Sequence, residues 1–188
     1  VPRTNLVGEV DQGGEIFNRM MVPERLTSAG GALGAARAAL DVATRYSAKR
    51  RAFGKVIREF QAVSFRLAGA VARLDAARGL AFAACRAADG SGDPRRLVSE
   101  AKKFCTETAW EAVNVAMQTM GGIGYTNVYP VERLLRDVRL MTIWTGTNDV
   151  MDLLIQHEWY REVLERETTG RDIEADVPTG GDDEKDYG

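Results

Sequence analysis

One apolar face, sustained from residue 60 to residue 84, constrains the fold of this chain more than any other feature. Apolar residues recur there at spacings of three and four for about six turns, as they do on one side of an amphipathic α-helix. Charged residues such as Arg66, Arg73 and Arg86 fall outside the face. A helix of this kind is stable only when its apolar side packs against other elements. The positions that form the face are Phe60, Val63, Leu67, Ala70, Leu74, Ala77, Ala81 and Ala84.

The residues before this face, 15–51, are rich in alanine and also have a helical pattern, but Pro23 interrupts it. Proline is tolerated in the first turn of a helix, whereas in the interior it kinks the helix. We therefore expect a short helix that ends near Val22 and a long helix from Glu24 to about Lys49.

Three glycines in this long helix, Gly30, Gly31 and Gly34, are unusual, because each costs roughly 1 kcal/mol relative to alanine in a helix interior. Two interpretations remain open. The glycines could allow another helix to pack closely, or they could leave room for a ligand beside the backbone.

A turn at residues 90–94 separates the second long helix from a third. Asp93 suits the N-cap and Pro94 the first helical position, so the third helix is expected to begin there and to run to about Met120. The glycine-rich stretch 121–124 then breaks the helical pattern. The residues of this helix expected to face inward are Leu97, Ala101, Phe104, Ala112 and Val115.

Two further helices are expected after this break. A short one follows Pro130 and ends near Leu140. The last begins at Thr147 or Asn148, both common capping residues, and runs to about Arg166. No strand is predicted.

Long helices joined by short turns pack as antiparallel neighbours. The expected fold class is therefore all-α, an up-down four-helix bundle with a short extra helix. The bundle would comprise residues 15–166. Residues 1–14 would be a lead-in without a core of their own, and the acidic, glycine-rich residues 167–188 a disordered tail.

The composition excludes several classes of protein. A chain of 188 residues that is 45% hydrophobic and 28% charged is typical of one globular domain. The net charge of −2 argues against nucleic acid as a partner. No stretch is long and apolar enough to span a bilayer, and no signal peptide is recognised. The chain starts at Val1 without a methionine, which fits a piece excised from a longer protein.

The two cysteines, Cys85 and Cys105, lie within apolar helical patterns and are interpreted as reduced core thiols of a cytoplasmic protein. His157 is the only histidine. One histidine cannot supply the usual ligand cluster of a zinc site, so no metal is predicted and His157 is interpreted as structural or exposed.

Two stretches carry residue types suited to binding. Residues 50–55 with Gln61 place a guanidinium, an aromatic ring and an amide close together, and the fork of arginine suits a pyrophosphate. The same stretch can equally be a basic helix end that opposes the helix dipole. Residues 143–148 place a glycine turn before a helix N-terminus, where free N–H groups favour an anion. Neither pattern is specific on its own.

Taken together and in order, the motifs make residues 1–165 resemble the C-terminal helical domain of the acyl-CoA dehydrogenase family. The matching stretches are Val1-Pro2, Asn5-Leu6, Gly8-Glu9, Glu24-Arg25-Leu26, Ala29 to Gly34, Arg50 to Lys55, Phe60-Gln61-Ala62, Gln118, Gly121 to Tyr125, Tyr129 to Arg133, Leu135-Arg136-Asp137 and Gly146-Thr147.

The resemblance implies a bundle that assembles into homotetramers, with FAD bound between subunits and an acyl-CoA as substrate. It also implies that residues 1–14 link the bundle to a β domain that this chain lacks. By matching positions, the residues implied in FAD binding are Arg50, Phe53, Gln61, Gln118, Gly121, Gly122 and Thr147. Those implied near the substrate are Arg25, Trp144 and Gly146.

The position of the catalytic base departs from the commonest pattern of the family. Most members carry a glutamate just before the Gly-Thr of the last helix, where this chain has Thr145, which cannot act as that base. A branch resembling the isovaleryl-CoA and long-chain enzymes supplies the glutamate from the first long helix, at a position that matches Glu24. The base must be a carboxylate within reach of the substrate and shielded from water. The alternative is that Glu24 is an exposed glutamate that stabilises the start of a helix.

The function that the resemblance implies is the FAD-dependent oxidation of an acyl-CoA to the trans-2-enoyl-CoA, with electrons passed to an electron-transfer flavoprotein. The alternative is a catalytically inactive helical oligomerisation module or a relic fragment. It stays open because the N-terminal helical domain and the middle β domain of the family, which supply much of the flavin and substrate site, are absent from this chain.

Overall fold

The computed structural model describes residues 1–164, and the predicted acidic tail therefore lies outside the described residues. Six α-helices carry the fold, which confirms the predicted all-α bundle. In chain order the elements are η1 (Arg3–Asn5), α1 (Gly13–Ser47), β1 (Arg51–Ala52), β2 (Lys55–Val56), η2 (Ile57–Glu59), α2 (Gln61–Ala88), α3 (Arg95–Met120), α4 (Gly122–Tyr125), α5 (Val131–Met141) and α6 (Asn148–Leu164).

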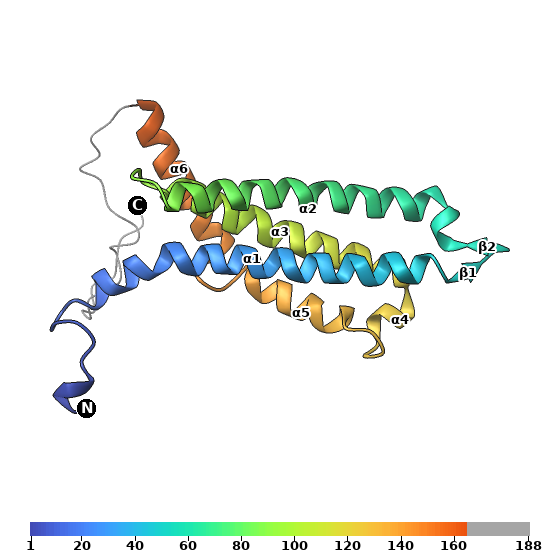
Figure 1. The fold of residues 1–188 in the computed structure, drawn as a ribbon, viewed down its shortest axis with the longest axis horizontal. Coiled ribbons are helices and arrows are strands. Elements are labelled where there is room, and N and C mark those ends of the chain that lie inside the picture. The colour runs from blue at the N-terminus through green and yellow to red at the C-terminus, as the bar shows by residue number, and fades with distance from the viewer. Residues whose placement is uncertain (165–188) are drawn as a thin grey trace, which may run out of the picture.

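The central element of the bundle is α3, which contacts α1, α2, α5 and α6. Helices α1, α2 and α3 run along the long axis of the molecule, and α5 lies beside α1 (Figure 1). The β1–β2 hairpin and α6 lie at opposite ends of the bundle (Figure 1). No helix within residues 1–164 combines the length and the hydropathy needed to cross a membrane.

Helix α1 is continuous through Pro23, so the predicted division into two helices is wrong. A proline removes one backbone hydrogen bond, and Pro23 is exposed, so solvent can reach the backbone there. The helix accommodates it by a bend in its N-terminal part (Figure 1). Met21 packs inside before the proline, and Arg25 after it contacts the Thr145 carbonyl, so tertiary contacts on both sides hold the helix across the bend.

The contact between α1 and α3 is built largely from alanine. These alanines are fully or almost fully buried and recur at helical spacing on both helices. Because a methyl group is small, the two backbones can approach closely. The residues are Ala32, Ala36, Ala39 and Ala43 on α1 and Ala109, Ala112 and Ala116 on α3.

Most helix boundaries agree with the predicted ones. The backbone N–H of Arg95 donates to Asp93 Oδ1 at 2.9 Å, which confirms Asp93 as the cap of α3. The N–H of Val150 donates to Thr147 Oγ1 at 3.3 Å, so Thr147 caps α6. Two burial predictions are wrong. Phe104 is 41% exposed because it lies over the edge between α3 and α6, and Cys85 is exposed near the end of α2.

A short hairpin that was not predicted follows α1. Strands β1 and β2 are antiparallel, with Ala52 opposite Lys55. The two residues between them, Phe53 and Gly54, have φ angles of 49° and 83°. Two-residue hairpin loops require such positive φ values, which glycine adopts easily and phenylalanine rarely does. The sequence lacks the Asn-Gly or Asp-Gly pair that marks this turn type, and each strand has only two residues.

Candidate functional site

The predicted site residues fall into two groups at opposite ends of the bundle. One group surrounds the hairpin just beyond the C-terminal end of α1. The other surrounds Arg25 and the loop between α5 and α6. The stretch of α1 from Arg25 to Ser47 alone is about 33 Å long, at a rise of 1.5 Å per residue.

At the hairpin end, four of the predicted cofactor residues line one concavity of about 370 Å³. Arg50 reaches it from the end of α1, Gln118 from the last turn of α3, and Gly121 and Gly122 from the start of α4. A Cβ atom added to either glycine would have no neighbour within 4 Å. The backbone is therefore open on this side, and a guanidinium and an amide flank it.

Phe53 and Gln61 lie at the same end of the bundle but do not line this concavity. Phe53 stands at the tip of the hairpin with 94% of its surface exposed. Its ring meets the Phe60 ring edge-on at a centroid distance of 6.3 Å, and Lys55 Nζ lies 4.5 Å from the Phe60 centroid. Gln61 is the exposed first residue of α2. An exposed aromatic ring held in a strained backbone conformation suits contact with another molecule.

At the other end, the loop between α5 and α6 packs against α1. Trp144 Nε1 donates a hydrogen bond to Ser28 Oγ at 2.9 Å. Arg25, which is only 4% exposed, places Nε 3.5 Å from the carbonyl oxygen of Thr145, at the long limit of a hydrogen bond. The structure thus brings Arg25 together with the loop of Trp144, Gly146 and Thr147, and the roles implied for these residues stay predictions.

Two consecutive residues of this loop have left-handed backbone conformations. Thr145 has a φ of 53° and Gly146 a φ of 88°. Glycine suits its position because an added Cβ would lie 2.8 Å from Met151 Cε. Thr145 is β-branched, for which this conformation is unfavourable. Its Oγ1 atom is buried and has no hydrogen-bond partner among residues 1–164.

Glu24 is exposed on α1, one residue before the buried Arg25. In the part of the chain that the structure describes, its carboxylate makes no hydrogen bond or ion pair. The carboxylate is therefore free to contact another molecule, next in sequence to Arg25, which meets the loop that carries Thr145. The assignment of Glu24 as the base stays a prediction.

Sequence reasoning missed Lys102, which is fully buried on α3. Its Nζ donates to the carbonyl oxygen of Gly146 at 2.7 Å and to Asn148 Oδ1 at 2.9 Å. Burial, and to a smaller extent the charge of Arg25, lowers the pKa of Lys102 to about 8, while Glu107 acts in the opposite direction. A signal was present in the sequence, because Lys102 sits at a position of the buried stripe Val98, Cys105, Ala109, Ala112 and Ala116.

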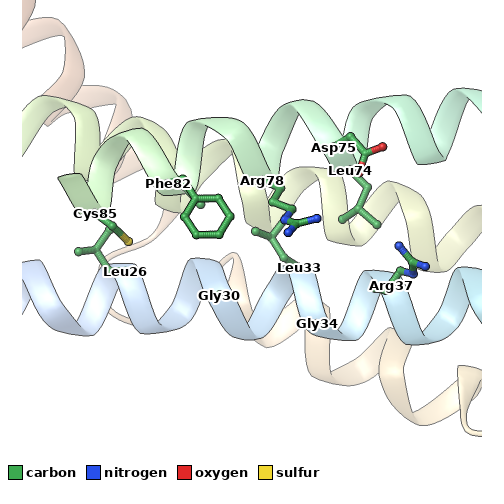
Figure 2. Close-up of a pocket in the computed structure, with 11 residues that line it drawn as sticks. Leu26, Gly30, Leu33, Gly34, Arg37, Leu74, Asp75, Arg78, Phe82 and Cys85 are labelled. Carbon is green, nitrogen blue, oxygen red and sulfur yellow. The ribbon is translucent and has the colours of Figure 1, made fainter. Parts of the chain in front are cut away.

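A second concavity, of about 380 Å³, lies between α1 and α2. Leu26 and Leu33 of α1 and Phe82 and Arg78 of α2 point toward one another across it (Figure 2). Gly30 and Gly34 line it, and a Cβ at either would have no neighbour within 4 Å. The backbone at Gly30 and Gly34 is therefore open within residues 1–164, and room for a ligand there stays a prediction. Gly31 lies elsewhere, and a Cβ there would be 3.8 Å from Met141 Cε.

Comparison with known proteins gives one family. The family model described as "Acyl-CoA dehydrogenase, C-terminal domain" matches residues 11–159. A 3-(aryl)acrylate reductase of Clostridium sporogenes is 37% identical over 155 residues, which are 82% of this chain and 41% of that protein. The mitochondrial isovaleryl-CoA dehydrogenase of Oryza sativa is 35% identical over 162 residues, or 86% of this chain and 40% of that protein.

Solved structures agree with these relatives. Butyryl-CoA dehydrogenase from Megasphaera elsdenii superposes with a TM-score of 0.79 at 35% identity, over 86% of this chain and 42% of that one. An FAD complex of PigA superposes with a TM-score of 0.78 at 28% identity, over 85% and 42% of the two chains. The chain thus spans about two fifths of the length of the relatives it matches.

Proposed function

This chain belongs to the acyl-CoA dehydrogenase family, whose C-terminal domain it matches, and from that premise we propose that it serves the FAD-dependent oxidation of an acyl-CoA thioester to the trans-2-enoyl-CoA. The observation that carries the proposal is the arrangement of the predicted residues. Residues implied in cofactor binding gather at the hairpin end, and residues implied near the substrate gather around Arg25 at the other end.

The residues at the hairpin end suit FAD chemically. Arg50 offers a fork-shaped cation to a pyrophosphate, Gln118 offers an amide, and the open backbone at Gly121 and Gly122 allows close approach. The exposed ring of Phe53 offers a flat apolar surface. The match to a protein whose structure was solved as an FAD complex supports the same cofactor.

The separation of the two groups supports a site shared between copies of the chain. More than 30 Å of helix lies between Arg25 and Arg50, which suggests that the two ends of one chain serve different sites. In the proposed homotetramer, the hairpin end of one copy and the surroundings of Arg25 of another would serve the same FAD site. Exposed Phe65, Val71 and Phe82 on α2 offer apolar surface for such assembly.

In the proposed reaction, the flavin would supply the acceptor for the hydride that leaves the substrate β-carbon. The residues of this chain would bind and orient the cofactor and the acyl-CoA, and would remove a proton from the acyl-CoA. The Glu24 carboxylate would take the proton from the α-carbon, because the residue before Gly146 is Thr145, which cannot act as a carboxylate base. The match to an isovaleryl-CoA dehydrogenase supports this position for the base.

The Trp144 side chain would help to shape the substrate pocket, since its hydrogen bond to Ser28 fixes the indole against α1. An electron-transfer flavoprotein would be the partner protein that accepts the electrons. The remaining walls of the pocket, which would shield Glu24 from water, would come from parts of the protein outside this chain.

A visible absorption spectrum tests the proposal. The chain would be produced together with any coding sequence that lies upstream, purified, and recorded before and after addition of short, branched, long and aryl acyl-CoAs. We expect a yellow protein that one class of acyl-CoA bleaches. A colourless oligomer that stays colourless with added FAD would refute the proposal and favour the alternative, an inactive helical oligomerisation module, for which the exposed apolar residues of α2 would be the interface.

A further inference from the structure

We infer that Lys102 is a positioning residue, which holds the loop of residues 144–147 from inside the bundle and fixes the direction of the amide N–H groups that the loop presents outward. The catalytic consequence of this inference rests on the proposed function. The claim that Lys102 holds the loop does not rest on the proposed function, because it can be measured without cofactor or substrate.

Lys102 contacts the loop on both sides of Thr147. Its Nζ donates to the Gly146 carbonyl oxygen at 2.7 Å and to Asn148 Oδ1 at 2.9 Å. Asn148 is held in turn by α3, since its Nδ2 donates to Thr106 Oγ1 at 3.1 Å. Because Lys102 and Thr106 lie one turn apart on the same long helix, the loop is anchored to a rigid element.

Fixing a carbonyl also fixes the N–H of the same peptide group. A trans peptide is planar, and its C=O and N–H point in opposite directions. With the Gly146 carbonyl directed at Lys102, the Thr147 N–H points away from α3. In the same way, the approach of Arg25 Nε to the Thr145 carbonyl directs the Gly146 N–H away from Arg25. Within residues 1–164 neither N–H has a hydrogen-bond partner.

The backbone of the loop needs such support. Thr145 and Gly146 both have positive φ angles, and such conformations persist only where the surroundings enforce them. A buried cation that binds one oxygen of the loop and one of Asn148, the residue that follows it, supplies that restraint. The alternative is that Lys102 only satisfies its own hydrogen bonds and adds to general stability. The two roles differ in what happens to Trp144 and to turnover when Lys102 is changed.

The first experiment uses the whole chain without ligand. Lys102→Met keeps an unbranched apolar side chain, one atom shorter than lysine, and removes its donors. Trp144 serves as the reporter in a background in which Trp110 and Trp159 are replaced by phenylalanine. We expect Lys102→Met to shift the Trp144 emission to the red and to increase its quenching by acrylamide, with an unchanged far-UV circular dichroism spectrum.

Lys103→Met is the matched control, because Lys103 is the next residue of α3 and pairs instead with Asp152 at 2.9 Å. Trp144 emission and quenching identical in the Lys102→Met and Lys103→Met variants would overturn the inference. If Lys102→Met fails to fold, Lys102→Gln, which is as long as methionine and keeps an amide donor, takes its place in the same comparison.

The second experiment uses the flavin-loaded, complete enzyme. In Lys102→Met, a displacement of the loop by even 1 Å should lower kcat by about 100-fold, with a smaller change in KM. Lys103→Met should keep the kcat and KM of the unaltered enzyme. Full turnover by Lys102→Met would overturn the catalytic part of the inference. An unaltered enzyme that binds no flavin would instead refute the proposed function, and the fluorescence comparison would still decide whether Lys102 holds the loop.

Discussion

Ser28 and Trp144 are 116 residues apart in the sequence and are joined by a hydrogen bond of 2.9 Å from the indole Nε1 to the serine Oγ. Ser28 is buried in α1, whereas Trp144 lies in the loop before α6 and is 43% exposed. The bond therefore ties a partly exposed loop to the interior of the longest helix. The position of this loop depends on α1 as well as on α3.

Loss of this bond should weaken the fold measurably. We expect Ser28→Ala to lower the free energy of unfolding by about 1 kcal/mol, the usual contribution of one hydrogen bond. Urea unfolding followed by circular dichroism would measure the change. Ser91→Ala, at an exposed position in the turn before α3, is the control and should have no effect. Equal stability of the two variants would contradict the prediction.

Replacement of Glu24 should separate chemistry from folding. In the flavin-loaded enzyme, Glu24→Gln should lower kcat by at least about 100-fold, because it removes the base, and should keep the flavin absorbance and the melting temperature. Glu15→Gln, in the first turn of the same helix, should leave turnover unchanged. Normal turnover in Glu24→Gln would show that the base lies elsewhere.

Two glycines should respond in opposite directions to the same substitution. Gly146→Ala should destabilise by about 1–2 kcal/mol, because an L-residue is unfavourable at a φ of 88° and the new Cβ would crowd Met151. Gly79→Ala should stabilise by about 0.5–1 kcal/mol, because Gly79 is helical and its Cβ would meet no atom within 4 Å. Differential scanning calorimetry would measure both, and the same sign of change in both variants would refute this account.

The lowered pKa of Lys102 predicts a rise in stability with pH. The folded protein releases this proton near pH 8, whereas the unfolded chain retains it until about pH 10.5. Between these values the unfolded state binds more protons, so the free energy of unfolding rises with pH, by at most about 3 kcal/mol from this group. Urea titrations from pH 7 to pH 10.5 should show that the unaltered chain gains stability relative to Lys102→Met. If the difference in free energy of unfolding between the two proteins stayed constant over this pH range, the lowered pKa of Lys102 would be contradicted.

The two thiols should react at different rates. Cys85 is exposed, whereas Cys105 is fully buried, and burial, with a smaller contribution from the charge of Cys85, raises the pKa of Cys105 to about 12. Because the thiolate is the reactive form, a disulfide reagent such as Ellman's should modify one thiol per native chain quickly and the second only on unfolding. Cys85→Ser should abolish the fast phase. Two fast thiols would show that Cys105 is accessible.

The sequence predicted the helices well where one side of a helix is buried throughout. The three-and-four spacing in residues 60–84 corresponds to α2, in which Ala70, Leu74, Ala77 and Ala84 are buried. It failed where a single residue opposes the pattern. Pro23 does not divide α1, because buried residues on both sides stabilise the helix across it. Phe104 is apolar but exposed, because neighbouring α6 does not cover that edge of α3.

The motifs of the sequence selected residues that the structure brings close together, and the roles of these residues stay predictions. Arg50, Gln118, Gly121 and Gly122 meet in one concavity, and Arg25 meets the 144–147 loop. The supporting residues were not found, because their role depends on packing. Lys102 is a charged residue, normally expected at the surface, and only the neighbouring loop shows why it is buried. Phe53 and Gly54 form a hairpin turn without the usual turn residues.

The alanine contact between α1 and α3 has a consequence for how the chain orders itself. Alanine has no rotamers to lose, so at these positions bringing the helices together costs no side-chain entropy. Larger side chains would have to settle into one of several rotamers before the same surface could form. A single distance between α1 and α3 is therefore favoured as soon as they pack. The loop of residues 144–147, which contacts both helices, then binds to a pair of helices whose spacing is already fixed.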